Sequence, residues 1–348
     1  MMGEDSRRIL VVKLSSIGDV VQSLPVAGAL RRRFPRGYIA WAVGPAAAEV
    51  VTGNPHLSEV LVVGGCGADG GGVRSLPALT SPVRLRRALR NIGFDITLDL
   101  QGLFKSAAIA YLSGARERIG FRSLQEATFL FNNRRLVPDR RDVHAVESYL
   151  DFAQVLGAER EPVEFTIAIS DDDRQRVDAL LEGRDRLAAL IPGARWESKL
   201  WPTDRFAAVA DALAGDAGLE SVVVGAPADG GLAAAIAERA RSPILDLTGK
   251  TTLKQAAEVF RRCRVTVGND TGPLYISAAM GTPTVAVFGP TDARRLGPYG
   301  EGHAKVVAEV ECAPCRNRRC HGRRCMKAIA AEQVVEAALN LLRARQEV

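Results

Sequence analysis

Short apolar runs alternate with amphipathic segments along almost the whole chain, and this alternation constrains the fold more than any other feature. In the first half, the runs 8–14, 38–44 and 94–102 are each followed by a segment with helical periodicity. The second half repeats the pattern, with runs such as 186–193 and 264–270. Strands that alternate with helices in this way predict an α/β fold, with parallel sheets covered by helices on both faces.

The 348 residues are enough for two domains of ordinary size. The acidic segment 169–183 starts with a run of Asp, which is typical of a helix N-terminus. It lies between two apolar runs, 162–169 and 186–193, and we expect both runs to be strands. We therefore predict domains at 1–165 and 185–325, followed by a C-terminal helical segment at 326–348. The glycine-rich stretch 64–75 is expected to be a loop.

The charge of the chain is uneven. Residues 1–160 hold 21 Lys and Arg against 15 Asp and Glu, whereas residues 161–348 hold 25 of each. A basic excess in one half favours an anionic partner there, either nucleic acid, an acidic membrane surface or a phosphorylated substrate. An ordinary arginine-rich soluble surface is the alternative. No apolar run reaches the ~18–20 residues of a membrane span, and the N-terminus does not resemble a signal peptide, so we expect a cytoplasmic protein.

The stretch 264–292 is the most informative about chemistry. A strand ends in the sequence GNDTG, and a helix begins at Pro273. Backbone N–H groups of Thr271 and Gly272 would point out of the helix N-terminus, where they favour an anion such as phosphate. Asp270 would orient the loop or accept hydrogen bonds from a sugar. The alternative is that Gly and Pro only make tight turns here.

The stretch 7–35 raises the opposite question. It predicts a strand, a tight turn and a helix, as at the start of a nucleotide-binding domain. Its turn, SSIGD, has a single glycine and places Asp19 where a phosphate would be repelled. From position alone, Asp19 is best interpreted as the N-cap of the following helix.

Four segments in order, VVKLSSIGDVVQSLP, DLQGLFKSA, SKLWP and GNDTGPLYISAAMGTPTVAVFGPT, resemble glycosyltransferase family 9, the ADP-heptose:lipopolysaccharide heptosyltransferases. The similarity runs from about residue 8 to 340 and is strongest to heptosyltransferase I, which adds the first heptose to the Kdo sugars of lipid A. It implies a GT-B fold, in which two Rossmann-like domains face a cleft and the C-terminal helix crosses back to the N-terminal domain. It also implies inverting transfer from an ADP-heptose type donor, with no cofactor or metal required for catalysis.

The resemblance assigns roles to individual residues. Asp19 matches the proposed general base, and Lys199 matches the lysine that neutralises the departing diphosphate. The donor-binding set is Arg195, Asp229, Asp270, Thr271, Gly272 and Tyr275. Tyr275 stands where the family often has histidine, and Arg195 stands in a region where the family often has Ser or Thr.

The resemblance also gives the basic first half a purpose, because Kdo carboxylates and lipid A phosphates bind arginine well. The acceptor-binding set is Lys105, Arg84, Arg86, Arg87, Arg122, Arg134, Arg135 and His144. An anionic, lipid-linked acceptor would keep the protein at the inner face of the inner membrane. A solvated protein surface is the alternative for each arginine.

The spacing of four cysteines near the C-terminus suits a metal ligand set. The candidates for a structural zinc site are Cys312, Cys315, Cys320 and Cys325. Free thiols and disulfides are the alternatives.

Two other functions are compatible with parts of this pattern. A UDP-sugar 2-epimerase also uses two Rossmann-like domains, but it lacks the SSIGDV and DLQG combination. A nucleic-acid-binding protein would account for the basic half and the cysteines. Aromatic residues make up only 5% of the chain and are scattered, so no stacking platform is evident. We therefore expect no nucleic acid partner.

Overall fold

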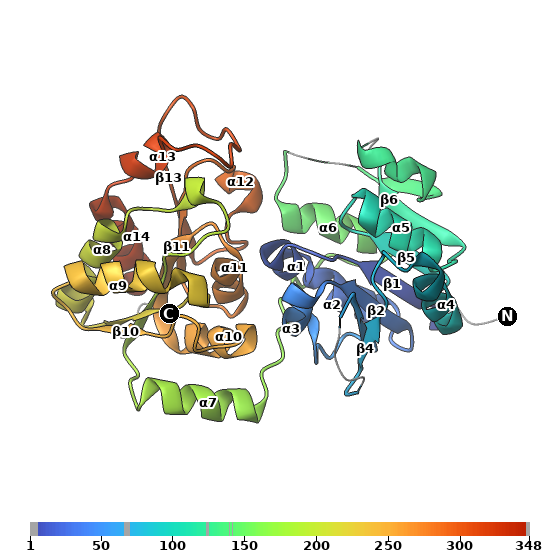
Figure 1. The fold of residues 1–348 in the computed structure, drawn as a ribbon, viewed down its shortest axis with the longest axis horizontal. Coiled ribbons are helices and arrows are strands. Elements are labelled where there is room, and N and C mark those ends of the chain that lie inside the picture. Colours follow the sequence, from blue (N-terminus) through green and yellow to red (C-terminus); the bar gives the residue numbers. More distant parts are fainter. Residues whose placement is uncertain (1–5, 66–69, 123–124, 139, 141, 346–348) are drawn as a thin grey trace. The chain divides into compact units, whose positions relative to one another are not determined.

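The computed structural model describes residues 6–65, 70–122, 125–138, 140 and 142–345. Its internal contacts divide the chain into two compact units, Met1–Ala168 and Ile169–Val348. Each unit contains one parallel sheet with helices on both faces (Figure 1). The α/β prediction is therefore confirmed. The division falls at residue 168, beside the acidic segment where we expected the boundary.

The first unit is built on a seven-stranded sheet in the order β4-β3-β2-β1-β5-β6-β7. Its strands are β1 (Arg8–Val12), β2 (Tyr38–Val43), β3 (Glu59–Val63), β4 (Val73–Leu76), β5 (Ile96–Asp99), β6 (Glu117–Phe121) and β7 (Arg134–Val137). Its helices are α1 (Ile17–Ser23), α2 (Pro25–Arg33), α3 (Ala48–Val51), α4 (Pro82–Ile92), α5 (Phe104–Leu112) and α6 (Ala145–Gln154), with short 3-10 turns η2 (Pro45–Ala47) and η3 (Gln125–Leu130).

The second unit is built on a six-stranded sheet in the order β10-β9-β8-β11-β12-β13. Its strands are β8 (Leu187–Ile191), β9 (Glu220–Val223), β10 (Ile244–Asp246), β11 (Cys263–Asn269), β12 (Thr284–Phe288) and β13 (His303–Val307). Its helices are α7 (Asp171–Leu181), α8 (Thr203–Ala217), α9 (Gly230–Arg239), α10 (Leu253–Arg262), α11 (Gly272–Ala279), α12 (Ala293–Leu296), α13 (Arg324–Ala328) and α14 (Ala331–Ala344), with turns η4 (Glu197–Lys199) and η5 (Pro227–Asp229).

The central strands are apolar on both faces, as a buried parallel sheet requires. In β1, Leu10 and Val12 belong to the cluster that buries Leu85 and Leu89 of α4. The intervening Ile9 and Val11 are equally buried. In the second sheet, alternate residues of β8, β11 and β12 pack with Phe206 of α8 in a single core. This packing fixes the carboxyl ends of the strands.

The C-terminal helix α14 belongs to the second unit by its contacts. It packs on α8 and on β11, β12 and β13, and it buries Val334 and Ala338 in the second core. The segment is therefore not a separate one, because its apolar stripe covers the second sheet. Its direction toward the N-terminal domain stays a prediction.

Several local predictions were wrong. Residues 162–169 form no strand; Asn54 and Arg32 of the first unit instead donate hydrogen bonds to the carbonyls of Thr166 and Pro162. Part of the glycine-rich stretch forms β4, and the strands β7 and β13 were not foreseen. The single helix expected in the stretch 7–35 is two helices, with Pro25 as the first residue of α2, because proline lacks the N–H that would continue α1.

Close backbone contact at the centre of the second sheet leads to a stability prediction. A Cβ added at Gly268 would lie 2.7 Å from Cβ of Ile191 on the neighbouring strand. Gly268→Ala should therefore lower the free energy of unfolding by about 1–3 kcal/mol in chemical denaturation. Gly215 on α8 has open space around it, so Gly215→Ala is the control and should stabilise by about 0.5–1 kcal/mol. Equal effects of the two substitutions would contradict the packing described here.

Candidate functional site

In both sheets the strands run parallel, but the order in which the chain adds them reverses near the centre of the sheet. Such a switch point is where open α/β sheets bind ligands. In the first unit the point lies between β1 and β5, and in the second between β8 and β11. The loops that follow these four strands contain the SSIGD, DLQG, SKLWP and GNDTG motifs. The fold therefore gathers the sequence motifs into two clusters, one in each unit.

The first cluster is centred on Asp19, the third residue of α1. Its Oδ2 accepts hydrogen bonds from Ser16 N (3.1 Å) and Ser16 Oγ (2.7 Å). Ser16, not Asp19, is the N-cap, and Asp19 closes the capping box. The second oxygen, Oδ1, accepts a long hydrogen bond of 3.4 Å from the Tyr149 hydroxyl. One carboxylate oxygen is thus held firmly by the loop, and the other is held more weakly by α6.

A buried lysine lies behind this carboxylate. Lys13 Nζ donates to the Tyr149 hydroxyl at 2.8 Å, and Lys13 is only 4% exposed. Burial by itself would raise the pKa of Asp19, but the charge of Lys13 and the hydrogen bonds from Ser16 and Tyr149 outweigh it and lower this pKa. Burial acts against the charged form of Lys13, yet Tyr149 and Asp19 raise its pKa. Both groups are therefore ionised at neutral pH.

The DLQG motif holds the SSIGD loop. Gln101 Oε1 accepts hydrogen bonds from the backbone N–H groups of Leu14 (2.8 Å) and Ser15 (3.3 Å). Asp99 is fully buried, and its Oδ1 accepts from Gly102 N at 3.0 Å. Burial raises the pKa of Asp99 despite hydrogen bonds from Ser106, Asn132 and the turn. Sequence reasoning did not assign roles to Lys13, Tyr149 or Gln101; a lysine at the end of an apolar strand was the available signal for Lys13.

The second cluster is centred on Asp270, which is 5% exposed. Its Oδ2 accepts from Lys199 Nζ (2.6 Å) and from the Thr291 hydroxyl (2.6 Å). Its Oδ1 accepts from the Tyr275 hydroxyl. Both oxygens are engaged by donors of the same unit, so Asp270 orients Lys199 and the loops. Tyr275 therefore supports Asp270, and its place in the donor-binding set stays a prediction.

Lys199 also lies against an aromatic ring. Its Nζ is 4.4 Å from the centre of the Trp196 ring, and Cζ of Arg318 is 4.6 Å from the same centre. Arg318 comes from the cysteine-rich segment, whose Arg316 N–H donates to Pro290 O at 2.7 Å. The two cations lie within cation–π distance of one ring. Trp196, Thr291 and Arg318 were not identified from the sequence.

The other predicted donor residues lie at the same edge of the second sheet. Thr271 is the N-cap of α11, and Gly272 is its first residue, so the helix N-terminus is available to an anion. Arg195 is exposed in the loop after β8. The Asp229 carboxylate lies against Gly193 and accepts a hydrogen bond from Ala226 N at 2.8 Å. Asp229 therefore stabilises its own turn.

The predicted acceptor residues are less tightly gathered. Arg122 follows β6 at the carboxyl edge of the first sheet, and Lys105 is exposed at the start of α5. Arg84, Arg86 and Arg87 are exposed on α4. Arg134 starts β7 and pairs with Glu117 at 3.2 Å, at the amino ends of their strands, away from the edge that holds Asp19.

Arg135 and His144 are the last two members of the predicted acceptor set. Arg135 lies within β7, but its side chain is outside the described residues. His144 is the N-cap of α6 and accepts from Val146 N at 3.2 Å through Nδ1.

Cys312, Cys315, Cys320 and Cys325 carry free thiols in the structure. The structure therefore shows no disulfide between these four residues. Burial and the neighbouring thiols of Cys312, Cys315 and Cys320 raise the pKa of Cys325. In the part of the chain that the structure describes, no group of three or more His, Cys, Asp or Glu side chains is arranged to hold a metal ion. The structural zinc site stays a prediction.

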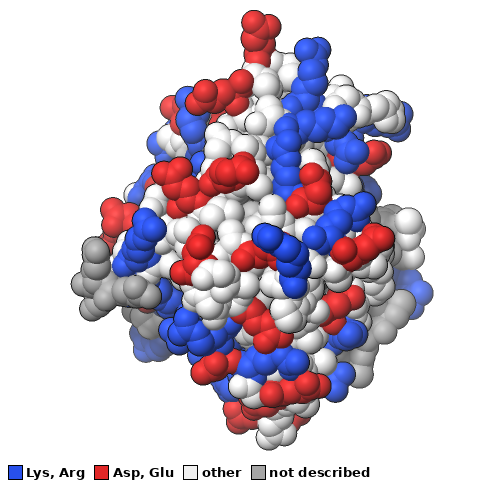
Figure 2. All heavy atoms as spheres, turned by 90° about the vertical axis from the view of Figure 1, so that its left-hand side faces the viewer, with Lys and Arg blue, Asp and Glu red and all other residues white. Residues whose placement is uncertain are grey.

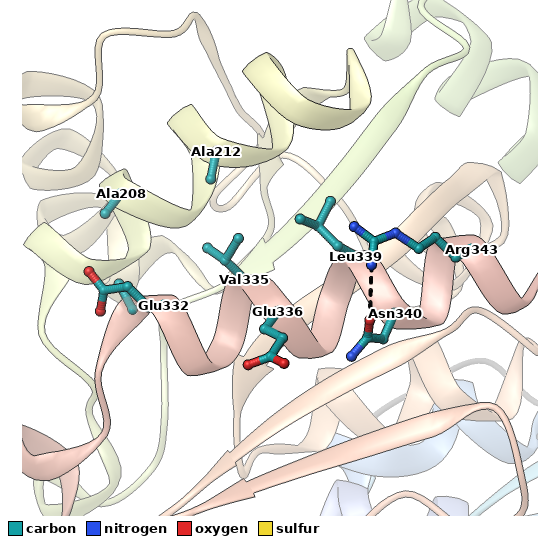
Figure 3. A pocket seen from close by; sticks show the side chains of 9 residues that line it. Ala208, Ala212, Glu332, Val335, Glu336, Leu339, Asn340 and Arg343 are labelled. Atoms are coloured by element: carbon teal, nitrogen blue, oxygen red, sulfur yellow. Dashed lines mark hydrogen bonds between the residues drawn. The ribbon is translucent and has the colours of Figure 1, made fainter.

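A separate hollow of about 330 Å³ lies between α8 and α14. Ala208 and Ala212 of α8 line it opposite Val335 and Leu339 of α14 (Figure 3). None of the predicted site residues lines this hollow, and its wall is mostly apolar. It is therefore a gap in helix packing and not the functional site.

The lowered pKa of Asp19 predicts a pH-dependent contribution to stability. Because the folded value lies below the ordinary value of about 3.9, the contribution is present at neutral pH and is lost as the pH falls through the folded value. Asp19→Asn should be less stable than wild type at pH 7, and the difference should close in acid. Denaturant unfolding at several pH values measures it, with Asp216→Asn, exposed on α8, as the control. A difference that grows towards acid pH would show that the assigned direction is wrong.

Because Asp270 is buried, loss of the Tyr275 hydroxyl should have a large effect on the free energy of unfolding. Tyr275→Phe removes one donor to a buried carboxylate and should cost about 1.5–3 kcal/mol of unfolding free energy. Tyr111→Phe, in which the tyrosine is 53% exposed, is the matched control and should change stability by less than about 0.5 kcal/mol. If the two variants have equal unfolding midpoints, Tyr275 does not support Asp270.

Comparison with known proteins identifies the family of this chain. The model of glycosyltransferase family 9 (heptosyltransferase) matches residues 83–325. Lipopolysaccharide heptosyltransferase 1 of Pseudomonas aeruginosa is 29% identical over 327 residues, covering 90% of this chain and 87% of that protein. The crystal structure of a family 9 glycosyl transferase from Veillonella parvula has a TM-score of 0.81 and 25% identity, and 98% of each chain is covered.

A third similar structure is the E. coli heptosyltransferase WaaC with ADP-2-deoxy-2-fluoro heptose. It has a TM-score of 0.71 and 24% identity, covering 94% of this chain and 98% of that chain. The GT-B fold is thereby confirmed, and the family match decides against the epimerase and the nucleic-acid-binding protein. The chain belongs to glycosyltransferase family 9, the heptosyltransferase family, and is a glycosyltransferase.

Proposed function

We propose that this enzyme transfers a heptose, with inversion and without a catalytic metal, from an ADP-activated donor to a Kdo-lipid A type acceptor of the lipopolysaccharide core. The observation that carries the proposal is the arrangement at the two switch points. One cluster presents an ionised carboxylate with one weakly held oxygen, and the other presents a lysine beside a helix N-terminus. An inverting transfer needs these two chemical elements.

The second unit is proposed to hold the donor. The diphosphate would lie at the N-terminus of α11, where the N–H groups of Thr271 and Gly272 favour an anion. Lys199, held by Asp270, would balance the charge that develops on ADP as it leaves. The relatives support this choice of donor, since the E. coli heptosyltransferase was solved with a fluorinated ADP-heptose.

The first unit is proposed to supply the base. As the acceptor oxygen forms its bond to the anomeric carbon, Oδ1 of Asp19 takes the hydroxyl proton, and the bond from that carbon to the diphosphate breaks. Lys13 keeps Asp19 ionised between turnovers. A carboxylate is a weak base, but the acceptor proton becomes acidic as the new bond forms, so proton transfer requires no raised pKa.

The acceptor is proposed to be anionic and lipid-linked, in keeping with the basic excess of residues 1–160. Lys105 and Arg122, near the carboxyl edge of the first sheet, are the best placed of the predicted contacts. In contrast, acidic and basic side chains are interspersed over most of the face in Figure 2, which carries elements of the second unit. Among the described residues, no helix has both the length and the apolar character that crossing a bilayer requires. Because the proposed acceptor is lipid-linked and anionic, we propose a peripheral position at the inner membrane.

A transfer assay with ADP-heptose and Kdo-bearing lipid A tests this function. Wild type should release ADP and form the heptosylated product at the same rate with and without EDTA. Asp19→Asn should lower kcat by about 10²-fold or more, because it removes the proton acceptor. Asp216→Asn should keep the wild-type rate, and thermal melting should confirm that all variants are folded.

Two results would contradict parts of the proposal. Full activity of Asp19→Asn would remove this residue as the base. Transfer from another nucleotide sugar, with none from ADP-heptose, would overturn the donor assignment while leaving the enzyme a glycosyltransferase.

A further inference from the structure

We propose that one surface of the first unit docks this enzyme directly on an anionic phospholipid bilayer. The surface, called the docking patch below, is formed by α4, the start and outer face of α5, and η3. The inference rests on the proposed function, because a lipid-linked acceptor is presented at a membrane. The docking patch consists of the apolar residues Val83, Leu103, Phe104, Tyr111, Phe129 and Leu130, with the basic residues Arg84, Arg86, Arg87 and Lys105.

The exposed apolar side chains of the described residues are concentrated on this patch. Of the seven large ones that are more than a third exposed, six lie here. They include Val83 (73%), Leu130 (67%) and Phe104 (50%), whereas the seventh, Val307, lies alone in the second unit. Single exposed apolar residues are ordinary on protein surfaces, but a group on adjoining elements marks an interaction site.

Contacts between these elements make the patch continuous. Helix α5 packs against both α4 and η3. The Phe131 ring lies 5.3 Å from that of Phe104 and 5.8 Å from that of Tyr111, measured between ring centres. The Glu126 carboxylate of η3 accepts a hydrogen bond from Phe104 N at 2.9 Å. The aromatic side chains are thereby held on one rigid support.

The charge of the patch identifies the occupant. Segments 70–94 and 100–116, which contain α4 and α5, hold no Asp or Glu. The side chains of Arg84, Arg86, Arg87 and Lys105 are exposed there, and Glu126 is the acid whose carboxylate caps α5. Basic residues near a membrane surface are attracted to anionic headgroups, while exposed aromatic and aliphatic side chains enter the interface.

A second copy of the chain fits this surface less well. Two such patches would bring basic helices face to face without acids to balance them, so like charges would repel. The anionic bilayer satisfies both the apolar and the basic side chains. The geometry therefore favours lipid over self-association.

Co-sedimentation of the full chain with vesicles tests the proposal. Wild type should bind vesicles of phosphatidylcholine mixed with phosphatidylglycerol, bind phosphatidylcholine alone much less, and be released by salt. Phe104→Ser combined with Leu130→Ser should lower binding about tenfold or more, because two side chains no longer enter the interface. Val307→Ser, a similarly exposed position in the second unit, should bind like wild type. Equal binding of all three proteins, or equal binding to both lipids, would overturn the proposal.

A second measurement separates docking from catalysis. The double variant should transfer heptose to a deacylated, water-soluble acceptor at the wild-type rate, but should act more slowly on an acceptor embedded in anionic vesicles. Equal rates of variant and wild type on the embedded acceptor would overturn the docking patch without affecting the proposed function. Failure of wild type on the soluble acceptor as well as on the embedded one would count against the proposed function instead. Analytical ultracentrifugation that shows a dimer broken by the double variant, without vesicle binding, would assign the patch to self-association.

Discussion

The buried Asp270 carboxylate and the Lys199 ammonium beside it determine how the second unit is built. An ionised group without a partner in the interior is costly, and breaking a buried pair by removing one member typically costs about 3–5 kcal/mol. Asp270 accepts hydrogen bonds from three donors: Lys199 after β8, Tyr275 on α11 and Thr291 after β12. These contacts join three strand ends at the switch point of the sheet. The same pair holds a lysine where we propose that negative charge develops in the reaction.

The first unit uses the same principle with the signs reversed. Here the buried charge is Lys13, just after β1, and the carboxylate of Asp19 lies nearer the surface. Tyr149 on α6 contacts both groups, so a helix from the end of this unit contributes to a loop near its beginning. Gln101 holds the loop backbone through its amide oxygen. A phosphate-binding loop needs several glycines so that its backbone can approach the phosphate closely. The SSIGD turn has a single glycine, which suits a proposed base held by local hydrogen bonds.

Much of this arrangement could be predicted from the sequence. The alternation of apolar runs and helices gave the two parallel sheets, because periodicity is a local property. The GNDTG loop was visible as a local motif, whereas the roles predicted for Asp19 and Lys199 came from the resemblance to family 9, because position alone favours an N-cap for Asp19 and a surface lysine for Lys199. The pairing of Asp270 with Tyr275 and the support of Asp19 by Lys13 and Tyr149 could not be seen, because they join residues far apart in sequence or depend on which way a side chain points. The strand predicted at 162–169 was wrong for a related reason. The run has the composition of a strand, but it pairs with no strand of the described residues.

The central claim is that the two clusters divide the work, with the donor held by the second and the proton taken by the first. Calorimetric titration of ADP into two variants tests it most directly. Lys199→Met should weaken ADP binding about tenfold or more, because it removes the cation that we propose lies opposite the diphosphate. Asp19→Asn should leave the Kd within about twofold of wild type, as expected for a residue outside the nucleotide site. Loss of ADP binding in Asp19→Asn with wild-type affinity in Lys199→Met would contradict the division of roles.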